Sequence, residues 1–281
     1  MPEVIFKNMI FQGKTKLIKN IEVAKGYYKI IISCLEIAKT AKPGQFIQIK
    51  VCNDYEPLLR RPFSIHRIKG SSIEILYEVL GKGTQILSQK KPGEYLDVIG
   101  PLGNGFDYGS GGQQVKRSVV LVAGGMGVAP LLFLAETLVE RRMQNAERQT
   151  MVLIGAKTKD RILCEKEFQR LGFHVKIASD DGSRGFKGKV TDLLRHLLLA
   201  IDHQPSTIYA CGPRQMLEEV AKISKTHKIP AQVSLEEHMA CGIGICFGCA
   251  LKTKSGYKRV CKDGPVFETE DVIWKEEINY A

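Results

Sequence analysis

Residues 118–130 read Ser-Val-Val-Leu-Val-Ala-Gly-Gly-Met-Gly-Val-Ala-Pro, an apolar run that passes directly into a glycine-rich turn. An unbroken row of Val and Leu is typical of a strand buried on both faces, and residues 130–142 that follow have the apolar spacing of a helix. Three further pairs come downstream, with predicted strands at 151–154, 175–178 and 208–210 and predicted helices at 161–171, 190–201 and 214–227. This alternation predicts a parallel sheet with helices on both faces.

The part of the chain before this sheet has a different pattern. Residues 16–100 contain short runs rich in Ile, Val, Tyr and Phe, separated by turn signals such as Pro43-Gly44 and Pro92-Gly93. They predict one short helix at 84–88 and six strands, at 17–23, 27–34, 46–51, 63–68, 73–79 and 95–99. Strands of this number and spacing suit a small closed antiparallel barrel.

A glycine-dense stretch at residues 103–112 separates the two patterns. We therefore expect a β-barrel domain in residues 1–112, an α/β domain in 113–232 and a cysteine-rich subdomain in 233–281. A length of 281 residues suits this organisation, because domains usually contain about 100 to 200 residues.

Composition and charge exclude several function classes. Lys and Arg outnumber Asp and Glu by 41 to 30, but the basic residues are dispersed, without the aromatic-interleaved block of a nucleic-acid-binding face. The longest apolar run, residues 119–135, is interrupted by glycines and a proline, and it falls short of the roughly 20 residues of a membrane span. No apolar secretory segment opens the chain. The sequence therefore predicts a cytoplasmic protein with no membrane span and no nucleic-acid partner.

Four of the eight cysteines crowd near the C-terminus in the order Cys241-x4-Cys246-x2-Cys249, followed by Cys261. In a reducing compartment such short spacings favour thiolate ligands over disulfides, and this spacing is the plant-type [2Fe–2S] one. The glycines between them are expected to adopt positive φ and to bring amide N–H groups near the sulfurs: Gly242, Gly244 and Gly248. Structural zinc is the alternative, although it usually takes paired Cys-x2-Cys knuckles, and only one is present.

The glycine-rich turn at residues 124–130 offers a place for a pyrophosphate. Backbone approaches a phosphate closely only where side chains are absent, and the start of a helix supplies free N–H groups. The turn is not the Gly-x-Gly-x-x-Gly fingerprint, so a strand-to-helix turn without a ligand is the alternative. Cys211-Gly212-Pro213 ends the fourth predicted strand, at the edge where parallel sheets bind ligands, and a plain turn is its alternative.

Two segments of the predicted barrel suggest phosphate binding. In Arg60-Arg61-Pro62-Phe63-Ser64, the Arg61 guanidinium is placed to hold a phosphate. Arg61 and Ser64 are three residues apart, so they share a face only if the strand begins irregularly at Pro62. Gly81-Lys82-Gly83-Thr84, just before the predicted short helix, is a second candidate.

The order of these motifs, on a barrel followed by an α/β domain, resembles the ferredoxin-NADP reductase superfamily. The cysteine segment narrows the resemblance, because residues 234–249 together with Cys261-Lys-Asp-Gly-Pro-Val-Phe267 look like the electron-transfer subunits of NAD-dependent dihydroorotate dehydrogenases. The resemblance covers about residues 17–267.

The resemblance implies three cofactor sites and no catalytic residue beyond them. In the barrel it places Arg61 on the phosphates of FAD and the Ser64 hydroxyl near the flavin N5, with the remaining contacts at Pro62, Phe63, Tyr77, Glu78, Val79, Leu80, Gly83 and Thr84. In the α/β domain it places the NAD contacts at Gly124, Gly125, Gly127, Pro130, Cys211 and Gly212. It makes the ligands of the [2Fe–2S] cluster Cys241, Cys246, Cys249 and Cys261.

The implied activity is that of an NAD-linked oxidoreductase subunit in pyrimidine biosynthesis. A nicotinamide carries two electrons as hydride and an iron–sulfur cluster carries one at a time, so FAD would connect them. The chain has no room for a second barrel of about 250 residues that would oxidise a substrate. A dihydroorotate dehydrogenase catalytic subunit is therefore the implied partner, in a heterotetramer with two copies of each chain.

Three questions stay open from sequence. Asp180 and Asp181 follow the third strand of the sheet, and two carboxylates there would repel the 2′-phosphate of NADP, but Asp181-Gly182 also reads as a plain turn and Arg184 opposes the effect. Small subunits of NAD(P)H-linked ferredoxin oxidoreductase or sulfide dehydrogenase complexes look similar, although they often have Asp at the position of Cys241. A non-enzymatic, zinc-stabilised binding module is the alternative of another class.

Overall fold

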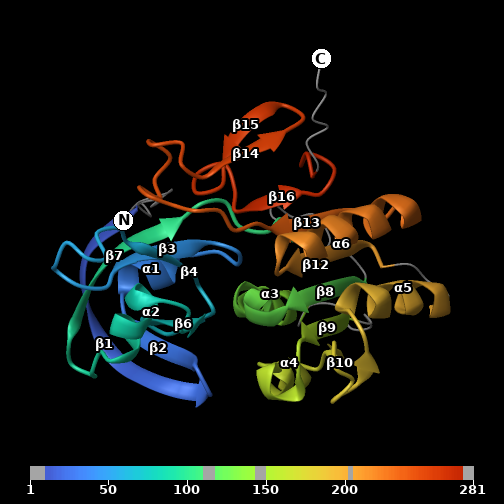
Figure 1. Ribbon diagram of the computed structural model, residues 1–281, viewed down its shortest axis with the longest axis horizontal. Coiled ribbons are helices and arrows are strands. Elements are labelled where there is room, and N and C mark those ends of the chain that lie inside the picture. The colour runs from blue at the N-terminus through green and yellow to red at the C-terminus, as the bar shows by residue number, and fades with distance from the viewer. Residues whose placement is uncertain (1–9, 110–117, 143–149, 202–204, 275–281) are drawn as a thin grey trace, which may run out of the picture.

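Seven antiparallel strands form the N-terminal barrel of the computed structural model, which describes residues 10–109, 118–142, 150–201 and 205–274 (Figure 1). The sheet order is β4-β3-β7-β1-β2-β6-β5. The strands are β1 (Phe11–Ala24), β2 (Tyr27–Ser33), β3 (Phe46–Lys50), β4 (Arg61–Ser64), β5 (Arg67–Lys69), β6 (Ser72–Glu78) and β7 (Tyr95–Leu102).

The predicted count of six strands is wrong by one, because the strand expected at 63–68 is two strands. The Ile65 N–H donates to Gln45 O on the β3 side, and the next N–H, that of His66, donates to Glu74 O of β6. The chain therefore changes its pairing partner between these two residues. β4 and β5 are the two ends of the sheet order, so the chain passes here from one edge of the sheet to the other. The antiparallel barrel expected from the sequence is present as a half-barrel, which stays open between these two edge strands instead of being closed.

The barrel interior is filled by branched apolar side chains, because alternate residues of each strand point inward. Ile30 and Ile32 of β2 face Ile75 and Ile73 of β6 in register, and all four are fully buried. Two short helices, α1 (Leu35–Thr40) and α2 (Lys82–Ser88), pack on the barrel core through the buried side chains of Ile37 and Leu87. The second contains the predicted helix at 84–88, and the first was not predicted.

The second sheet has the order β11-β10-β9-β8-β12-β13-β16 and is parallel except for its last strand. Its strands are β8 (Val119–Gly124), β9 (Thr150–Ala156), β10 (His174–Ser179), β11 (Phe186–Lys187), β12 (Thr207–Cys211), β13 (Ala231–Ser234) and β16 (Val266–Glu268). The connecting helices are α3 (Val128–Arg142), α4 (Glu165–Arg170), α5 (Val190–Ala200) and α6 (Arg214–His227), with 3-10 turns η1 (Gly125–Gly127) and η2 (Lys159–Arg161).

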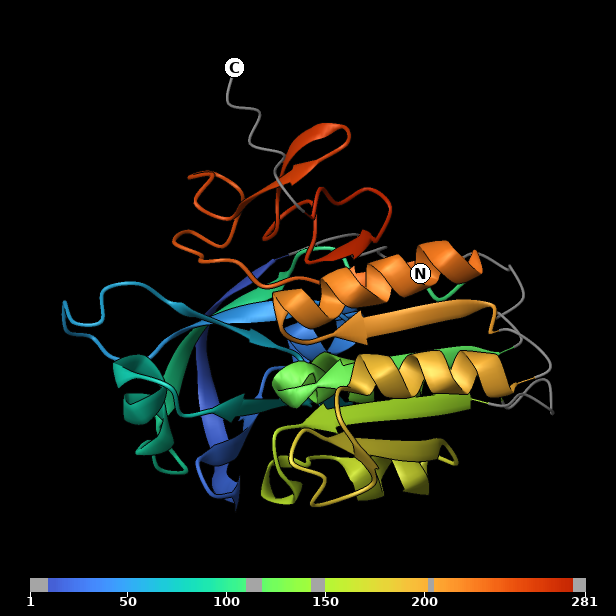
Figure 2. The same ribbon diagram turned by 45° about the vertical axis from the view of Figure 1, so that its right-hand side comes forward.

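Helices cover both faces of this sheet, as the alternation predicted. Val120 and Val122 of β8 pack in one core with Leu194 of α5 and Leu217 of α6, whereas the intervening Leu121 packs in the core that contains α3 and α4. Figure 2 shows α5 and α6 lying side by side over the near face of the sheet.

The C-terminal segment lies over the junction between the barrel and the parallel sheet (Figures 1 and 2). It contains the hairpin β14 (Ala250–Thr253) and β15 (Gly256–Arg259), and then β16, which pairs antiparallel with β13. The cysteine-rich part is therefore tied into the α/β sheet at its far end. The expected boundary at residue 112 lies outside the described residues, and the one at 232 falls inside β13. No helix in the described part of the chain is long and apolar enough to cross a membrane.

Candidate cofactor and metal sites

The loop of residues 241–249, named the cluster loop below, is shaped by residues in the left-handed region. Gly242 and Gly244 have φ of +69° and +84°, as expected for turns that only glycine adopts without strain. The third glycine differs from the expectation, since Gly248 is not among the residues with positive φ, and Phe247 adopts +57° in its place. Gly248 contributes instead through its N–H, which donates to Cys246 Sγ at 3.5 Å.

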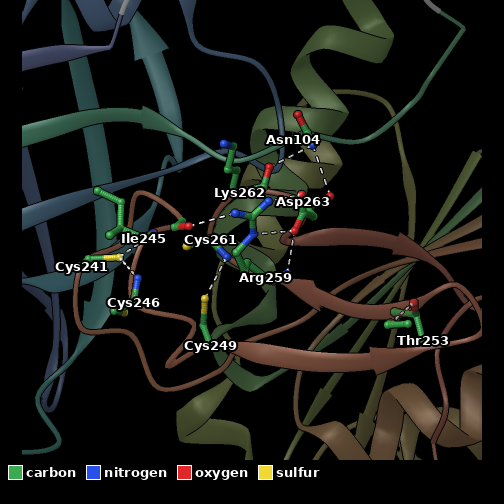
Figure 3. A network of polar contacts seen from close by, with 12 residues as sticks. Asn104, Cys241, Ile245, Cys246, Cys249, Thr253, Arg259, Cys261, Lys262 and Asp263 are labelled. Carbon is green, nitrogen blue, oxygen red and sulfur yellow. Dashed lines mark hydrogen bonds and ion pairs between the residues drawn. The ribbon is translucent and has the colours of Figure 1, made fainter.

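The four clustered sulfurs form two pairs with amide donors around them (Figure 3). Cys241 Sγ accepts from the N–H groups of Ile245 and Cys246 at 3.4 and 3.5 Å. Cys249 Sγ accepts from the N–H of Cys261 at 3.4 Å. Cys249 and Cys261 are each 2% exposed, whereas Cys246 is exposed. One pair thus lies inside the subdomain and the other at its surface.

The electrostatic surroundings of the two pairs differ. Desolvation opposes ionisation of Cys241, but hydrogen bonds from the amides of Cys246, Ile243 and Ile245 outweigh it and lower the pKa of this thiol to about 6. Burial, together with the hydrogen bond and charge of Cys249, raises the pKa of Cys261 to about 12. A thiolate at Cys261 therefore needs a cation beside it, and bound iron would supply that charge.

Arg259 connects the turns that carry the cysteines (Figure 3). Its guanidinium donates to the Gly244 carbonyl at 2.9 Å and to both carboxylate oxygens of Asp263 at 3.0 and 3.2 Å, and it lies 5.1 Å from the centre of the Phe247 ring. The hydrogen bond to Asp263 raises the pKa of Arg259. The positive charge is thus held beside the sulfurs, where it offsets thiolate charge.

These residues fit a binuclear iron–sulfur cluster better than a single zinc ion. Within residues 10–109, 118–142, 150–201 and 205–274, no three Cys, His, Asp or Glu side chains converge on one point as a mononuclear site requires. A [2Fe–2S] cluster takes four thiolates, spread as two pairs on two irons, and the cysteines form two pairs. Amide N–H groups directed at the sulfurs match the hydrogen bonding that such clusters receive.

The predicted nucleotide motifs meet at the carboxyl edge of the parallel sheet. Gly127 lies so close to the Cys211 carbonyl and the Gly212 amide that a Cβ at residue 127 would overlap them. A Cβ at Gly212 would likewise come within 3.0 Å of Gly124. Gly125, with φ of +53°, turns toward open space, and Pro130 lies in the first turn of α3, where its missing N–H is tolerated. Glycine at 127 and 212 therefore lets the two turns pack backbone against backbone, and of these three glycines Gly125 is the one beside open space, where a pyrophosphate could approach the start of α3.

The three polar residues after β13 have separate environments. Glu237 pairs with Arg214 at the start of α6, at 2.9 Å, and His238 is exposed. Glu236 is exposed, although desolvation raises the pKa of its carboxyl. The pKa of the Cys211 thiol is raised first by its own burial and then by the charge of Glu236, so the two side chains interact.

Arg61 and Gly83 come together at the edge of the barrel. A Cβ at Gly83 would lie 2.8 Å from Arg61 Nε and 3.3 Å from its Cγ, so the guanidinium lies directly over the start of α2. The Thr84 hydroxyl accepts from the N–H groups of Leu80 and Gly81 at 3.0 and 3.2 Å and fixes the turn. An arginine fork against a side-chain-free turn is a phosphate cradle.

Arg61 and Ser64 could share a face only if the strand began irregularly at Pro62, and this condition is not met. Pairing with β3 is regular from Arg61, opposite Ile49, to Ser64, opposite Phe46. Arg61 and Ser64 therefore leave the strand on opposite faces. Because β4 is an end strand of the sheet order, an elongated ligand such as FAD can pass around it and contact both residues. Pro62 is exposed on this strand, and Phe63 is buried.

The four residues proposed to line the rest of the flavin site differ in accessibility. Tyr77 is 2% exposed and packs on Phe63 with ring centres 5.6 Å apart, so it supports the site from the barrel core. Glu78 pairs with Arg161 of the α/β domain at 3.5 Å. Val79 is half-buried and Leu80 is largely exposed. Only the last three can contact a ligand directly.

The two carboxylates after β10 also differ. Asp181 accepts hydrogen bonds from the Ser183 N–H and hydroxyl at 2.9 and 2.7 Å, which lower the pKa of its carboxyl, and Gly182 follows with φ of +76°. It belongs to a turn. Arg184 pairs with Glu165 at 2.7 Å. Asp180 is exposed, and its role toward a nucleotide stays a prediction.

Two buried polar residues at the domain junctions were not predicted. His66 Nδ1 donates to the Ala129 carbonyl at 3.0 Å, because a carbonyl only accepts, and desolvation lowers the pKa of this ring to about 4, which keeps it neutral. Gln48 of β3 is fully buried against the cluster loop. A polar residue within an apolar strand was the only available signal for either.

Comparison with known proteins gives concordant matches. Residues 236–273 match the model of the iron–sulfur cluster binding domain of dihydroorotate dehydrogenase B, and residues 121–222 match that of an oxidoreductase NAD-binding domain. The electron transfer subunit of dihydroorotate dehydrogenase B (NAD(+)) from Desulforamulus reducens is 40% identical over 261 residues, 90% of this chain and 95% of that protein. Its counterpart from a Geobacillus species (strain WCH70) is 38% identical over 270 residues, 94% and 100% of the two chains.

Solved structures agree on the fold. The structure of an NADH-dependent reduced ferredoxin-NADP oxidoreductase, solved in work on flavin-based electron bifurcation, matches with a TM-score of 0.79 and 30% identity over 92% of this chain and 90% of that one. The cytochrome b5 reductase domain of Ulva prolifera nitrate reductase matches with a TM-score of 0.61 and 18% identity, over 74% and 89%. The second match shows a shared fold alone.

Proposed function

Because the chain belongs to the family of electron transfer subunits of dihydroorotate dehydrogenase B, we propose that it passes electrons from a dihydroorotate-oxidising partner to NAD+. The observation that carries the proposal is the set of four cysteines in two amide-surrounded pairs, lying over the junction of the barrel and the nucleotide-binding sheet. An electron-transfer subunit needs this arrangement of three sites, and a zinc-stabilised binding module does not.

Bound FAD exchanges a hydride with the nicotinamide and single electrons with the [2Fe–2S] cluster. In the proposal, the Arg61 guanidinium and the turn at Gly83 hold the phosphates of FAD, and the Ser64 hydroxyl hydrogen-bonds the flavin ring. The backbone of the turn at Gly124, Gly125 and Gly127, at the start of α3, holds the NAD pyrophosphate, and Gly127 and Gly212 let this turn pack closely against the end of β12. The positive charge of Arg259 stabilises negative charge at the cysteine site, so it would favour the reduced state of a bound cluster.

The partner is the catalytic subunit that the family name implies, and in the proposal two copies of each chain form the complex in the cytoplasm. Electrons enter at the cluster, so the partner must approach the surface above it. The exposed apolar side chains of the cluster loop mark that surface: Ile243, Ile245 and Phe247. Apolar side chains next to an electron-transfer group are typical of the centre of a protein–protein interface.

Ile245→Arg is expected to weaken binding of the catalytic subunit about 30-fold, because a charge replaces an apolar contact, a change of about 2 kcal/mol. Ile245 is 74% exposed, so the substitution leaves the fold and the cluster content unchanged. Affinity is measured by calorimetry or surface plasmon resonance with the purified partner. Leu199→Arg on α5 is the matched control, since this leucine is 78% exposed and far from the cysteines in sequence. Equal affinities for the two variants would contradict the assignment of this surface.

Asp180→Ser is expected to raise the ratio of kcat/KM with NADPH to that with NADH by roughly fivefold to tenfold, because one charge near the 2′-phosphate contributes about 1 kcal/mol. The wild-type chain is expected to prefer NADH. Asp271→Ser removes an equally exposed carboxylate from the C-terminal segment and is the control. A wild-type preference for NADPH, or an unchanged ratio in Asp180→Ser, would contradict this role.

A second function has support from one observation. The ferredoxin-NADP oxidoreductase structure covers 92% of this chain at 30% identity, so a partner that exchanges electrons with ferredoxin is the other candidate. The 40% identity of the dihydroorotate dehydrogenase relative and the presence of Cys241 favour the first.

Reconstitution distinguishes the two candidates. The cofactor-loaded chain is mixed anaerobically with a purified dihydroorotate dehydrogenase catalytic subunit, and NAD+ reduction is followed after addition of dihydroorotate or of reduced ferredoxin. NADH formation with dihydroorotate supports the first proposal. NADH formation with reduced ferredoxin but not with dihydroorotate supports the second proposal, provided that the same catalytic subunit oxidises dihydroorotate with an artificial electron acceptor.

A further inference from the structure

Gln48 joins the flavin face of the barrel to the cluster loop. It lies in the middle of β3, opposite Pro62 of β4, and Phe46 two residues earlier lies opposite Ser64. Residues directly opposite each other in a ladder share a face, so Gln48 and Ser64 project on the same side of the sheet. This is the side on which Phe46 packs in one core with Cys249 and Cys261.

The Gln48 side chain packs directly on the cluster loop. It is 0% exposed, and a Cβ at Gly242 would lie 2.7 Å from its Cγ, 2.9 Å from its Cδ and closer still to its Nε2. Gly242, with φ of +69°, immediately follows Cys241. Any shift of Gln48 is therefore transmitted to the backbone that carries this cysteine.

The amide of Gln48 is poorly satisfied for so buried a group. Among the residues that the structure describes, its Nε2 has one weak contact, with Met239 Sδ at 3.9 Å, and its Oε1 has no hydrogen-bond partner. Buried side-chain amides usually have partners. Hydrogen bonding therefore does not explain why a glutamine side chain is buried at residue 48. Its packing against Gly242 does explain the position.

A second, separate contact ties the other cysteine pair to the barrel. Asn104 Nδ2 donates to the carbonyls of Lys262 and Asp263, both at 3.2 Å, and the Asn104 N–H donates to Gly264 O at 2.6 Å. The segment after Cys261 is thus held by hydrogen bonds from the end of β7, while the Cys241 end is held by the packing of Gln48.

We propose that Gln48 is a positioning residue for electron transfer, whose packing on Gly242 sets the spacing between the flavin face of β4 and the Cys241 end of the cluster loop. The inference rests on the proposed function. The size and shape of the Gln48 side chain set this spacing, and its amide group contributes little. A side chain of similar size can therefore replace it. Removing the side chain lets the cluster loop move relative to the flavin face.

Gln48→Ala, Gln48→Leu and Gly242→Ala test the proposal in the cofactor-loaded chain. Hydrogen exchange of residues 240–249 reports loop order, and freeze-quench EPR after mixing with NADH reports the rate of electron transfer to the cluster. Gln48→Ala and Gly242→Ala are expected to speed exchange about 10-fold and to slow electron transfer about 10-fold, because the rate of electron tunnelling falls steeply as the flavin and the cluster move apart. Gln48→Leu is expected within about threefold of wild type.

Two control variants make the test specific. Gln12→Ala removes an exposed glutamine from β1. Gln12 and Gln48 lie on the two strands that flank β7, both opposite Ile99, and Gln12→Ala is expected to change neither readout. Asn104→Ala is expected to speed exchange at residues 259–264 and not at 240–249. The proposal is overturned if Gln48→Ala shows the same exchange and electron-transfer rates as Gln12→Ala. It is also overturned if Gln48→Leu shows the same rates as Gln48→Ala.

The outcomes separate this inference from the proposed function. If wild type transfers no electrons to the cluster, the proposed function fails, and the exchange data alone still show whether Gln48 orders the loop. If Gln48→Ala does not fold, Gly242→Ala loads the same contact from the other side and gives both readouts.

Discussion

Cys249→Ser abolishes the cluster while leaving FAD bound. Cys249 is 2% exposed and its Sγ accepts the Cys261 N–H at 3.4 Å, so its loss removes one ligand and disturbs a second. Serine binds iron more weakly than a thiolate does, and a four-cysteine cluster depends on each ligand. Iron and acid-labile sulfide per chain should fall below about a tenth of wild type. Both are measured by colorimetry on anaerobically purified protein, with flavin measured by absorbance.

Cys52→Ser is the matched control for this variant. Cys52 follows β3 in the barrel, where it packs against the edge of the barrel core, and its thiol donates to the carbonyls of Asp54 and Pro57. It should retain wild-type iron, sulfide and flavin. Full iron and sulfide in Cys249→Ser, or equal losses in the two variants, would contradict the ligand assignment.

Gly127→Val has the second-largest expected effect, on the nucleotide site. A Cβ at this position overlaps the Cys211 carbonyl, which is backbone and cannot rotate away. The turn between β8 and α3 must therefore move apart from β12. We expect the free energy of unfolding to fall by about 1–3 kcal/mol and NADH affinity to fall at least about tenfold, or 1.4 kcal/mol. Urea denaturation and a fluorescence titration measure these quantities.

Gly172→Asn separates the steric effect from the loss of a glycine. Gly172 follows α4 with φ of +81°, and nothing lies within 4 Å of a Cβ there, and asparagine tolerates this conformation. NADH affinity should stay at the wild-type value. A Gly127→Val protein that binds NADH as tightly as Gly172→Asn would show that the turn is not part of the nucleotide site.

The architecture could be predicted because the hydrophobic pattern carries it. The unbroken apolar run at residues 119–123 is a strand whose alternate residues face two helical layers, and the sequence shows this directly. The short strands of the barrel are equally evident from their turn residues. The division at Ile65 and His66 could not be predicted, because it depends on which carbonyl each N–H finds across the barrel.

In the sites, too, features set by residues close in sequence could be predicted, and contacts between residues far apart in sequence could not. Cysteine spacing could predict that these four sulfurs come together, because all four lie within 21 residues, where chain geometry limits where the sulfurs can go; their role as cluster ligands stays a prediction. The expectation for Gly248 failed because Phe247 adopts the left-handed conformation, with the Arg259 guanidinium over its ring. Gln48 could not be found, since its neighbour Gly242 is 194 residues away in sequence.

The central claim is that iron held by the cluster loop exchanges electrons with flavin held by the barrel. Anaerobic addition of NADH to the isolated, cofactor-loaded chain tests it most directly, with the flavin followed by absorbance and the cluster by EPR. We expect NADH to bleach the flavin and to produce the signal of a reduced [2Fe–2S] cluster, approaching in size the signal obtained with dithionite. Electron exchange between the two groups would be contradicted if NADH bleached the flavin but left the cluster EPR-silent, although dithionite reduced that cluster.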